Sequence, residues 1–299
     1  MISVVIPLYN KENQIADTIR SVLAQTCQEY EIVIVDDGST DRSVDVIKSI
    51  KDSRIRIIQQ TNAGVSAARN RGIEETRGEF IAFLDADDEW KTDYLSTQMN
   101  LVKKYPHCDI FATNYEFRDS QGKVFPTIIN RLPFIQNDGE LTNYFEVASC
   151  SHPPLWTSAV MVRKQAILSI GGFPVGVKSG EDLLTWARLS TNYKIAYCKE
   201  TKVLFRVEGY RITEKPKRIP AENDVVGRGL KLLLIEKHPK HIKAYISLWH
   251  KMRSSIYLRL NMRRKSIHEA IIGLSYDLLN YKLYVYIFLN LIPSKFRPF

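Results

Sequence analysis

The chain has 299 residues, 44% hydrophobic and 25% charged, which supports one large or two moderate globular domains and excludes a largely disordered protein. The formal net charge is +9, but residues 226–299 hold 14 Lys and Arg against 3 Asp and Glu, whereas residues 1–225 hold 28 against 30. Because the positive excess is confined to the C-terminal part, we expect no nucleic acid among the partners.

The N-terminus enters an apolar run at Ile2 without a preceding basic region, which argues against a secretory signal peptide. The four cysteines are scattered and show neither the spacing of a zinc site nor that of a disulfide framework. Both observations favour a reducing compartment, and we expect a cytoplasmic location.

Short apolar runs alternate with helical patterns in the N-terminal third of the chain. The predicted strands, each expected to be buried on both faces, are Val4–Pro7, Glu31–Asp36, Ile55–Ile58 and Phe80–Leu84. Helices are predicted between them, over residues 15–23, from an N-cap at Thr40 through Ile50, and over Ala63–Thr76. This alternation predicts a parallel sheet with right-handed crossovers, in which ligands bind beyond the carboxyl ends of the strands.

Three polar loops follow predicted strands and are therefore expected to meet at one crevice. They are the loops at residues 7–10, 36–39 and 85–88. Asp37 at a strand end can accept a hydrogen bond from the imide N–H of a uracil or thymine ring, although Asp36 and Asp37 could equally begin a turn before a capped helix. Arg69 could turn back toward a nucleotide or remain a solvated helix arginine.

The sequence Asp85-Ala86-Asp87 follows the apolar run Phe80–Leu84. Alternate residues of an extended segment point to the same side, so Asp85 and Asp87 can share a hard divalent cation and a ribose. Oxygen ligands suit Mg²⁺ or Mn²⁺, and the ion would bridge the two phosphates of a nucleotide sugar and act as a Lewis acid.

Four motifs, taken together and in order, resemble family 2 glycosyltransferases of the GT-A fold. They are SVVIPLYN at residues 3–10, IVDDGSTD at 34–41, NAGVSAARN at 62–70 and LDADD at 84–88. The resemblance covers roughly residues 1–210 and implies an α/β fold with a Rossmann-like, mixed and mostly parallel sheet flanked by helices. It also implies an inverting transfer from a nucleotide diphosphate sugar.

The same resemblance implies roles for single residues. Asp37 would contact the base, Asp85 the ribose or phosphate side of the donor, and Asp87 the metal, with Asp85 as a second candidate ligand. The residues expected to bind the donor are Pro7, Tyr9, Asn10, Glu12, Asp37, Arg69, Asp85 and Ala86.

An inverting displacement also needs a general base that takes a proton from the acceptor hydroxyl. Gly180-Glu181-Asp182 opens a helical pattern and resembles the catalytic segment of the family, so Asp182 is the predicted base and Glu181 the second candidate. Acidic residues in a first helical turn also simply favour the helix dipole. On the acceptor side, Trp156 and His152 are candidates for contact with a sugar, although a Trp at a strand start is more often part of the core.

Residues from 221 onward show apolar positions at helical spacing among basic residues, which predicts several amphipathic helices. We therefore expect a catalytic domain over 1–215, with a nucleotide-sugar half at about 1–105 and an acceptor half at about 106–215, and a basic helical extension over 216–299. The apolar stretch Leu283–Pro293 would span about 16 Å as a helix, too little for a hydrocarbon core of about 30 Å.

This extension could contact an anionic membrane peripherally, or it could pack on the catalytic domain with a solvated basic face. The aromatic residues expected at the membrane interface are Trp249, Tyr281, Tyr284, Tyr286 and Phe288. The first alternative implies a location at the inner face of a bacterial cell membrane.

Three hypotheses about function remain open at this point. The first is an inverting glycosyltransferase that uses a UDP-sugar and a glycan or lipid-linked glycan acceptor in bacterial surface polysaccharide synthesis. The second is a sugar-phosphate nucleotidyltransferase, although residues 7–10 stand where such an enzyme has a Gly-rich phosphate loop. The third is a non-catalytic protein that binds membrane or nucleic acid.

Overall fold

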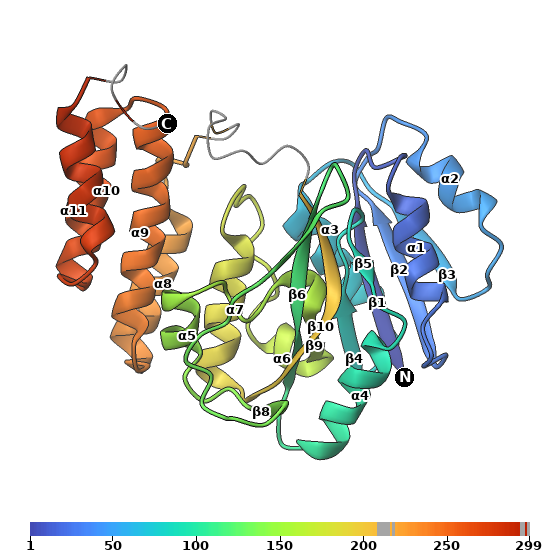
Figure 1. The fold of residues 1–299 in the computed structure, drawn as a ribbon. Coiled ribbons are helices and arrows are strands. Elements are labelled where there is room, and N and C mark those ends of the chain that lie inside the picture. Colours follow the sequence, from blue (N-terminus) through green and yellow to red (C-terminus); the bar gives the residue numbers. More distant parts are fainter. Residues whose placement is uncertain (208–215, 217–218, 294–296, 298–299) are drawn as a thin grey trace.

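The structure, a computed structural model, describes residues 1–207, 216, 219–293 and 297 (Figure 1). These residues form a ten-stranded sheet in the order β3-β2-β1-β4-β9-β6-β10-β5, with β7 paired to β6 and β8 paired to β10. The strands are β1 Ile2–Leu8, β2 Tyr30–Asp36, β3 Ile55–Gln59, β4 Phe80–Phe83, β5 Glu89–Trp90, β6 Ile110–Asp119, β7 Val124–Pro126, β8 Asp138–Glu140, β9 Val160–Arg163 and β10 Ile195–Val207.

Helices cover both faces of this sheet and continue beyond it. They are α1 Ile15–Leu23, α2 Ser43–Ser49, α3 Val65–Glu75, α4 Tyr94–Lys104, α5 Tyr144–Cys150, α6 Lys164–Ser169, α7 Glu181–Asn192, α8 Val225–Lys237, α9 Ile242–Arg259, α10 Arg263–Tyr276 and α11 Tyr281–Leu291, with a short 3-10 helix at Thr157–Ala159.

The sheet is mixed and mostly parallel, as predicted. Strands β1 to β4 are mutually parallel where they pair, and β6 and β10 are parallel to each other. Strand β9 runs antiparallel between β4 and β6 and joins the two parallel parts. All four N-terminal parallel strands therefore end at the same edge, which brings their following loops together.

Three details of the N-terminal prediction were wrong. Strand β3 is only partly buried, because it lies at the edge of the sheet and pairs with β2 alone. Helix α2 begins at Ser43 rather than after an N-cap at Thr40, whose backbone N–H donates instead to Asn10. Helix α3 begins at Val65, after Gly64 with a φ of 90° that favours glycine.

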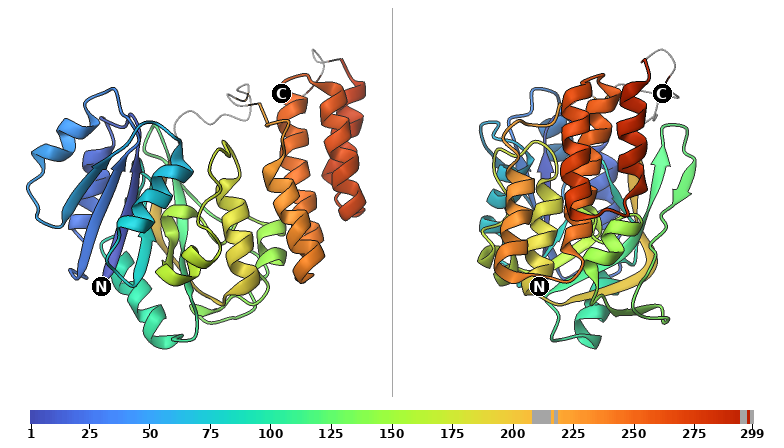
Figure 2. Two further views of the ribbon diagram at one scale, coloured as in Figure 1. Left: turned by 180° about the vertical axis from the view of Figure 1, so that it is seen from behind. Right: turned by 90° about the vertical axis from the view of Figure 1, so that its left-hand side faces the viewer.

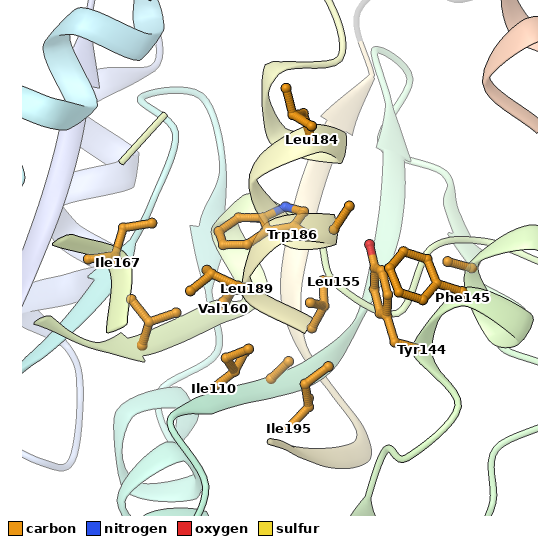
Figure 3. Close-up of a cluster of buried hydrophobic side chains, with 14 of the residues drawn as sticks. Ile110, Tyr144, Phe145, Leu155, Val160, Ile167, Leu184, Trp186, Leu189 and Ile195 are labelled. Atoms are coloured by element: carbon orange, nitrogen blue, oxygen red, sulfur yellow. The ribbon is translucent and has the colours of Figure 1, made fainter. Parts of the chain in front are cut away.

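Two apolar cores lie on opposite faces of the sheet. Helices α1, α2 and α4 cover one core, and helices α3, α5, α6 and α7 cover the other. In the second core, the indole of Trp186 on α7 packs 6.2 Å from the Phe83 ring and 5.6 Å from the Phe173 ring, measured between centroids. Figure 3 shows Trp186 above Leu189 and Val160, so α7 is fixed on the sheet by its apolar face.

The several helices predicted after residue 221 are confirmed as α8 to α11. Helices α8 and α9 lie next to α7 and α5, and α10 and α11 form an outer pair (Figures 1 and 2). The predicted domain boundary near residue 215 lies outside the described residues. No helix among the described residues is both long and apolar enough to cross a bilayer.

The contact between α3 and β1 depends on Gly72. A Cβ added at this buried glycine would lie 2.4 Å from Cγ1 of Val5 and 3.4 Å from its Cγ2. We expect Gly72→Ala to lower the free energy of unfolding by about 1–3 kcal/mol, because overpacking outweighs the higher helix propensity of Ala. Urea unfolding measures this, with Asn100→Ala on the exposed face of α4 as the control. An unchanged or raised stability of Gly72→Ala would contradict this packing.

Candidate active site

A cavity of about 950 Å³ opens at the edge where β1, β2 and β4 end. The loops after these strands, the start of α3 and residues 176–178 form its walls. The residues predicted for donor or metal binding that line it are Pro7, Tyr9, Asp37, Arg69, Asp85, Ala86 and Asp87. The convergence of three loops that the sequence predicted therefore exists in the structure.

Asp37 lies in the cavity wall with both carboxylate oxygens already hydrogen-bonded. Its Oδ1 accepts from Gln60 Nε2 at 2.7 Å and from the backbone N–H of Ala63 at 2.8 Å, and its Oδ2 accepts from the backbone N–H of Gly64 at 2.8 Å. The carboxylate thus fixes the loop that leads into α3. A carboxylate oxygen has two acceptor positions, so Oδ2 retains capacity for one further donor and base recognition stays a prediction.

Asn10 and Glu12 do not line the cavity but connect the β1 loop to the β2 loop. Asn10, with a φ of 51°, donates its backbone N–H to Ser39 Oγ at 3.0 Å and accepts from the backbone N–H of Thr40 at 2.8 Å. Glu12 Oε2 accepts from the backbone N–H of Arg42 at 2.9 Å. These bonds position the two loops, and donor contact by either residue stays a prediction.

Two carboxylates of the loop after β4 lie in the cavity wall, and each forms an ion pair with a different basic side chain. Asp85 Oδ1 lies 2.7 Å from Arg69 Nη2, and Asp87 Oδ2 lies 2.5 Å from Lys11 Nζ. The predicted extended segment is wrong, because residues 85–88 form a turn in which the backbone N–H of Asp88 donates to the carbonyl of Asp85 at 3.0 Å. Asp85 and Asp87 still share the cavity wall, and Ala86 between them is buried. A site for positive charge therefore exists at Asp87, the predicted metal ligand.

The third carboxylate of this loop, Asp88, is fully buried beneath the other two. Its Oδ2 accepts from Ser158 Oγ at 2.5 Å, and Ser158 Oγ also accepts from the backbone N–H of Asp85 at 3.1 Å. Burial raises the pKa of Asp88 well above its ordinary value, and the charges of Asp85 and Asp87 raise it further. Ser158 and Asp88 thereby tie the loop after β4 to the 3-10 helix before β9.

Arg69 links the donor side of the cavity to α7. Its side chain is 4% exposed, and its guanidinium lies 2.7 Å from Asp85 Oδ1 and 3.3 Å from Glu181 Oε1. The guanidinium also lies 5.0 Å from the centroid of the Phe173 ring. Burial lowers the pKa of Arg69, but the charges of Asp85 and Glu181 outweigh it and raise the pKa overall. The alternative of a solvated helix arginine is therefore wrong.

Glu181 and Asp182 begin α7 and have different surroundings. Burial and the charge of Asp182 raise the pKa of Glu181, although its ion pair with Arg69 opposes this. Burial also raises the pKa of Asp182, although the charge of Arg69 and the hydrogen bond that Oδ1 accepts from the backbone N–H of Leu183 at 2.7 Å oppose this. Neither carboxylate is part of the cavity wall itself, and Arg69 connects them to it.

Trp156 and His152 belong to an aromatic cluster rather than to the cavity wall. The Trp156 ring stacks on Tyr115 with centroids 5.1 Å apart and meets Phe205 edge-on at 4.8 Å. His152 lies 5.6 Å from Phe117 and accepts the backbone N–H of Ile128 at Nδ1. Both residues remain partly exposed, so acceptor contact stays a prediction.

Sequence reasoning missed Lys11, Ser158 and the position of Asp88. Lys11 directly follows the first polar loop, and its position next to Asn10 could have indicated that it lies near the cavity. No signal was available for Ser158, because its partners lie 70 and 73 residues away in the chain.

A group of three possible metal ligands, His107, Cys108 and Glu140, lies away from this site, since it precedes β6 at the opposite edge of the sheet. A hydrogen bond of 2.7 Å between His107 and Glu140 holds the two side chains together. Burial raises the pKa of the Cys108 thiol to about 11, so the thiol form predominates at neutral pH.

The comparison with protein families decides which family this site belongs to. The sequence model of glycosyl transferase family 2 matches residues 3–165, more than half of the chain. The chain belongs to glycosyl transferase family 2. This confirms the resemblance stated from the four motifs.

Relatives of this family 2 chain include GlyA of Streptococcus pneumoniae, a glycosyltransferase that is 30% identical over 255 residues, covering 82% of this chain and 36% of GlyA. TuaG of Bacillus subtilis, to which a glycosyltransferase role in teichuronic acid biosynthesis is provisionally assigned, is 31% identical over 200 residues, covering 66% of this chain and 75% of TuaG. The chain spans about a third of the length of the first curated relatives it matches.

The crystal structure of residues 1–349 of S. aureus TarS in complex with UDP-GlcNAc has the same fold as this family 2 chain. The TM-score is 0.68 at 18% sequence identity, over 96% of this chain and 83% of that one. The predicted mixed sheet with flanking and C-terminal helices is thereby confirmed as the GT-A fold.

The buried Arg69 yields a stability prediction for this family 2 chain. We expect Arg69→Gln to lower the free energy of unfolding by about 3–5 kcal/mol at pH 7.5, because the carboxylates of Asp85 and Glu181 lose their buried counter-ion. Without Arg69, the pKa of Glu181 in the folded state rises further above its unfolded value. The folded state then binds more protons, so the loss of stability should shrink as the pH falls to 5.

Urea unfolding at the two pH values measures this effect. Arg71→Gln is the matched control, because Arg71 lies on the same helix and pairs at the surface with Glu75 at 2.7 Å. Arg71→Gln should lower the free energy of unfolding by less than about 1 kcal/mol at both pH values. Equal losses for the two variants would show that Arg69 is not a buried counter-ion.

Proposed function

We propose that the chain is an inverting glycosyltransferase that moves a sugar from a nucleotide diphosphate donor to a hydroxyl group of a glycan or lipid-linked glycan. The observation that carries this proposal is the junction at Arg69. One buried guanidinium joins Asp85 in the donor cavity to Glu181, the neighbour of the candidate base Asp182. An acid-base group and a donor cavity are thus held next to each other.

A UDP-sugar is the donor class that fits the cavity best. Its volume of about 950 Å³ is large enough for a nucleotide sugar, and Asp37 Oδ2 can accept the imide N–H of uracil. The presence of UDP-GlcNAc in a crystal structure of TarS, which has the same fold, also supports this class. The proposed donor contacts are those of Pro7, Tyr9, Asp37, Asp85 and Ala86, with Asn10 and Glu12 supporting their loops.

The residues around Asp87 fit a divalent metal. Asp87 presents an oxygen ligand in the cavity wall, and its ion pair with the Lys11 ammonium at 2.5 Å supports a site for positive charge. Asp87 would hold Mg²⁺ or Mn²⁺, with Asp85 as a second ligand, and Lys11 would have to turn away from Asp87. Such an ion would supply positive charge for the departing diphosphate.

Asp182 is the proposed general base. Its carboxylate would accept the proton of the acceptor hydroxyl while that oxygen bonds to the anomeric carbon. The bond from this carbon to the diphosphate oxygen breaks on the opposite side, which inverts the configuration. Burial raises the pKa of Asp182, which makes it a stronger base than an exposed Asp, whereas Glu181 is paired with Arg69.

The acceptor would lie on the side of Trp156 and His152. The aromatic cluster reaches from these residues to Tyr115, and the charge of Asp182 contributes to the raised pKa of Tyr115, so the cluster and the candidate base are neighbours. Aromatic faces are suited to the apolar faces of sugar rings. The role provisionally assigned to TuaG supports an acceptor in bacterial surface polysaccharide synthesis.

The test is a transfer assay that detects released nucleoside diphosphate with a panel of nucleotide sugars and Mn²⁺. We expect Asp182→Asn to lower kcat by about 10²–10⁴-fold with the donor Kd unchanged, because only the proton acceptor is lost. The wild-type kcat should fall as the pH drops through the raised pKa of Asp182, because protonation removes the base. Glu181→Gln is the comparison for the second candidate.

Wild-type activity in Asp182→Asn would refute the assignment of the base. Release of pyrophosphate from a nucleoside triphosphate and a sugar phosphate would instead identify a nucleotidyltransferase. Detection of both products in the same assay format separates the two enzyme classes.

We also propose that the outer helices contact an anionic membrane, which would place the protein at the inner face of the bacterial cell membrane. Several large apolar side chains of this region are exposed, among them Leu279 at 90% and those of Leu278, Tyr281, Phe288 and Leu291. The excess of Lys and Arg in residues 226–299 complements anionic lipid headgroups. Trp249, expected at the interface, is buried and takes no part.

Sedimentation with vesicles that contain phosphatidylglycerol measures this contact. We expect the double substitution Leu279→Ser and Phe288→Ser to weaken binding about tenfold or more, because both side chains would leave the apolar part of the interface. Binding should also weaken as salt is raised. Ile135→Ser is the control, because Ile135 is 94% exposed but lies in the loop before β8. Unchanged binding of the double variant would contradict the contact.

A further inference from the structure

Helix α9 belongs to the C-terminal segment, yet it packs against the residues that begin α7. A Cβ added at Gly180 would lie 2.6 Å from Cζ3 of Trp249, so only glycine leaves room for the indole. Gly180 also has a φ of 80°, which glycine adopts without strain. The absence of a side chain immediately before Glu181 and Asp182 therefore allows α9 to pack closely against the start of α7.

Tyr245, one turn earlier on α9, contacts the same segment through its hydroxyl group. The hydroxyl donates to the backbone carbonyl of Leu183 at 3.3 Å and lies 3.0 Å from the hydroxyl of Tyr144 on α5. Figure 3 shows Tyr144 beside Phe145, to the right of the helix that carries Leu184 and Trp186. Burial raises the pKa of Tyr245, and the nearby charge of Asp182 contributes to this rise. The hydroxyl of Tyr245 thus holds the backbone one residue after the candidate base.

Helices α8 and α9 are themselves held firmly in this position. The indole N–H of Trp249 lies 3.1 Å from both carboxylate oxygens of Asp224, and Asp224 Oδ1 also accepts the backbone N–H of Gly227 in the first turn of α8. A Cβ added at Gly229 of α8 would lie 2.8 Å from Leu184 on α7. Close packing on both sides of the α7 N-terminus leaves little freedom for residues 180–184.

We propose that Tyr245 and Trp249 are positioning residues for the transfer step, and that helices α8 and α9 hold the backbone around Asp182 in place. Tyr245 holds the carbonyl of Leu183, and Trp249 holds the turn at Gly180, so the backbone on both sides of Asp182 is fixed. The inference rests on the proposed role of Asp182 as the general base.

The contacts of Tyr245 lie on the other side of Asp182 from the donor cavity. The α7 N-terminus reaches the cavity through the ion pair of Glu181 with Arg69, whereas the Tyr245 hydroxyl contacts Leu183, and neither Tyr245 nor Trp249 lines the cavity. Loss of the Tyr245 hydroxyl should therefore lower kcat and leave the donor Kd within twofold. Small misplacements of a catalytic group are known to cost one to two orders of magnitude in rate.

The experiment compares Tyr245→Phe with the matched control Tyr257→Phe in the full chain. Tyr257 is also buried on α9, and its hydroxyl also donates to a backbone carbonyl, but this carbonyl is that of Pro220, at 3.2 Å, before α8 rather than on α7. We expect Tyr245→Phe to lower kcat about tenfold with the donor Kd within twofold of wild type. Tyr257→Phe should leave both values within twofold, and Trp249→Phe should resemble Tyr245→Phe.

A second measurement places Tyr245→Phe in the Asp182→Asn background. If Tyr245 acts through Asp182, the residual rate of the double variant should lie within twofold of the rate of Asp182→Asn alone. A general loss of structure would instead lower the rate in both backgrounds. A full tenfold loss in the Asn background, or equal kcat values for Tyr245→Phe and Tyr257→Phe, would overturn the positioning role. Wild-type activity of Asp182→Asn would instead refute the base assignment itself.

Discussion

The buried guanidinium of Arg69 is the interaction on which the candidate site depends. It compensates Asp85 from the donor side and Glu181 from the start of α7, in a region that also holds Asp87, Asp88 and Asp182. Several carboxylates so close together would repel one another and take up protons without a fixed counter-ion. Arg69 therefore allows two parts of the fold that are far apart in sequence to place acidic groups around one cavity.

This charge arrangement also gives the carboxylates different counter-ions and different pKa values. Asp85 and Glu181 are tied to Arg69, Asp87 pairs with Lys11, and Asp88 is buried with a strongly raised pKa. At the start of α7, burial raises the pKa of Asp182 and its carboxylate has no ion pair among the described residues, which suits a group that must accept a proton. Neighbouring acidic groups with different environments can thereby perform different tasks.

The four N-terminal parallel strands, the meeting of three loops and the C-terminal helices were predictable, because apolar periodicity and strand-end polarity are local properties of the sequence. The partners of Arg69 were not, since Glu181 lies 112 residues away and side-chain contacts over such a distance leave no periodic signal. The same limit explains Trp249: helical spacing gives it an apolar face, but only the structure shows that the face meets Gly180 rather than a membrane. Thr40 failed as a cap because the helix begins later, at Ser43, whose backbone N–H donates to Asp41 Oδ1 at 2.9 Å.

We propose that the cavity holds a donor diphosphate with a metal at Asp87. A crystal grown with UDP and Mn²⁺ and measured at the manganese absorption edge is the sharpest test of this arrangement. We expect UDP in the cavity and an anomalous peak beside the Asp87 carboxylate, with Arg69 still joined to Asp85 and Glu181. UDP bound elsewhere, or a manganese peak at His107, Cys108 and Glu140 with none near Asp87, would contradict it.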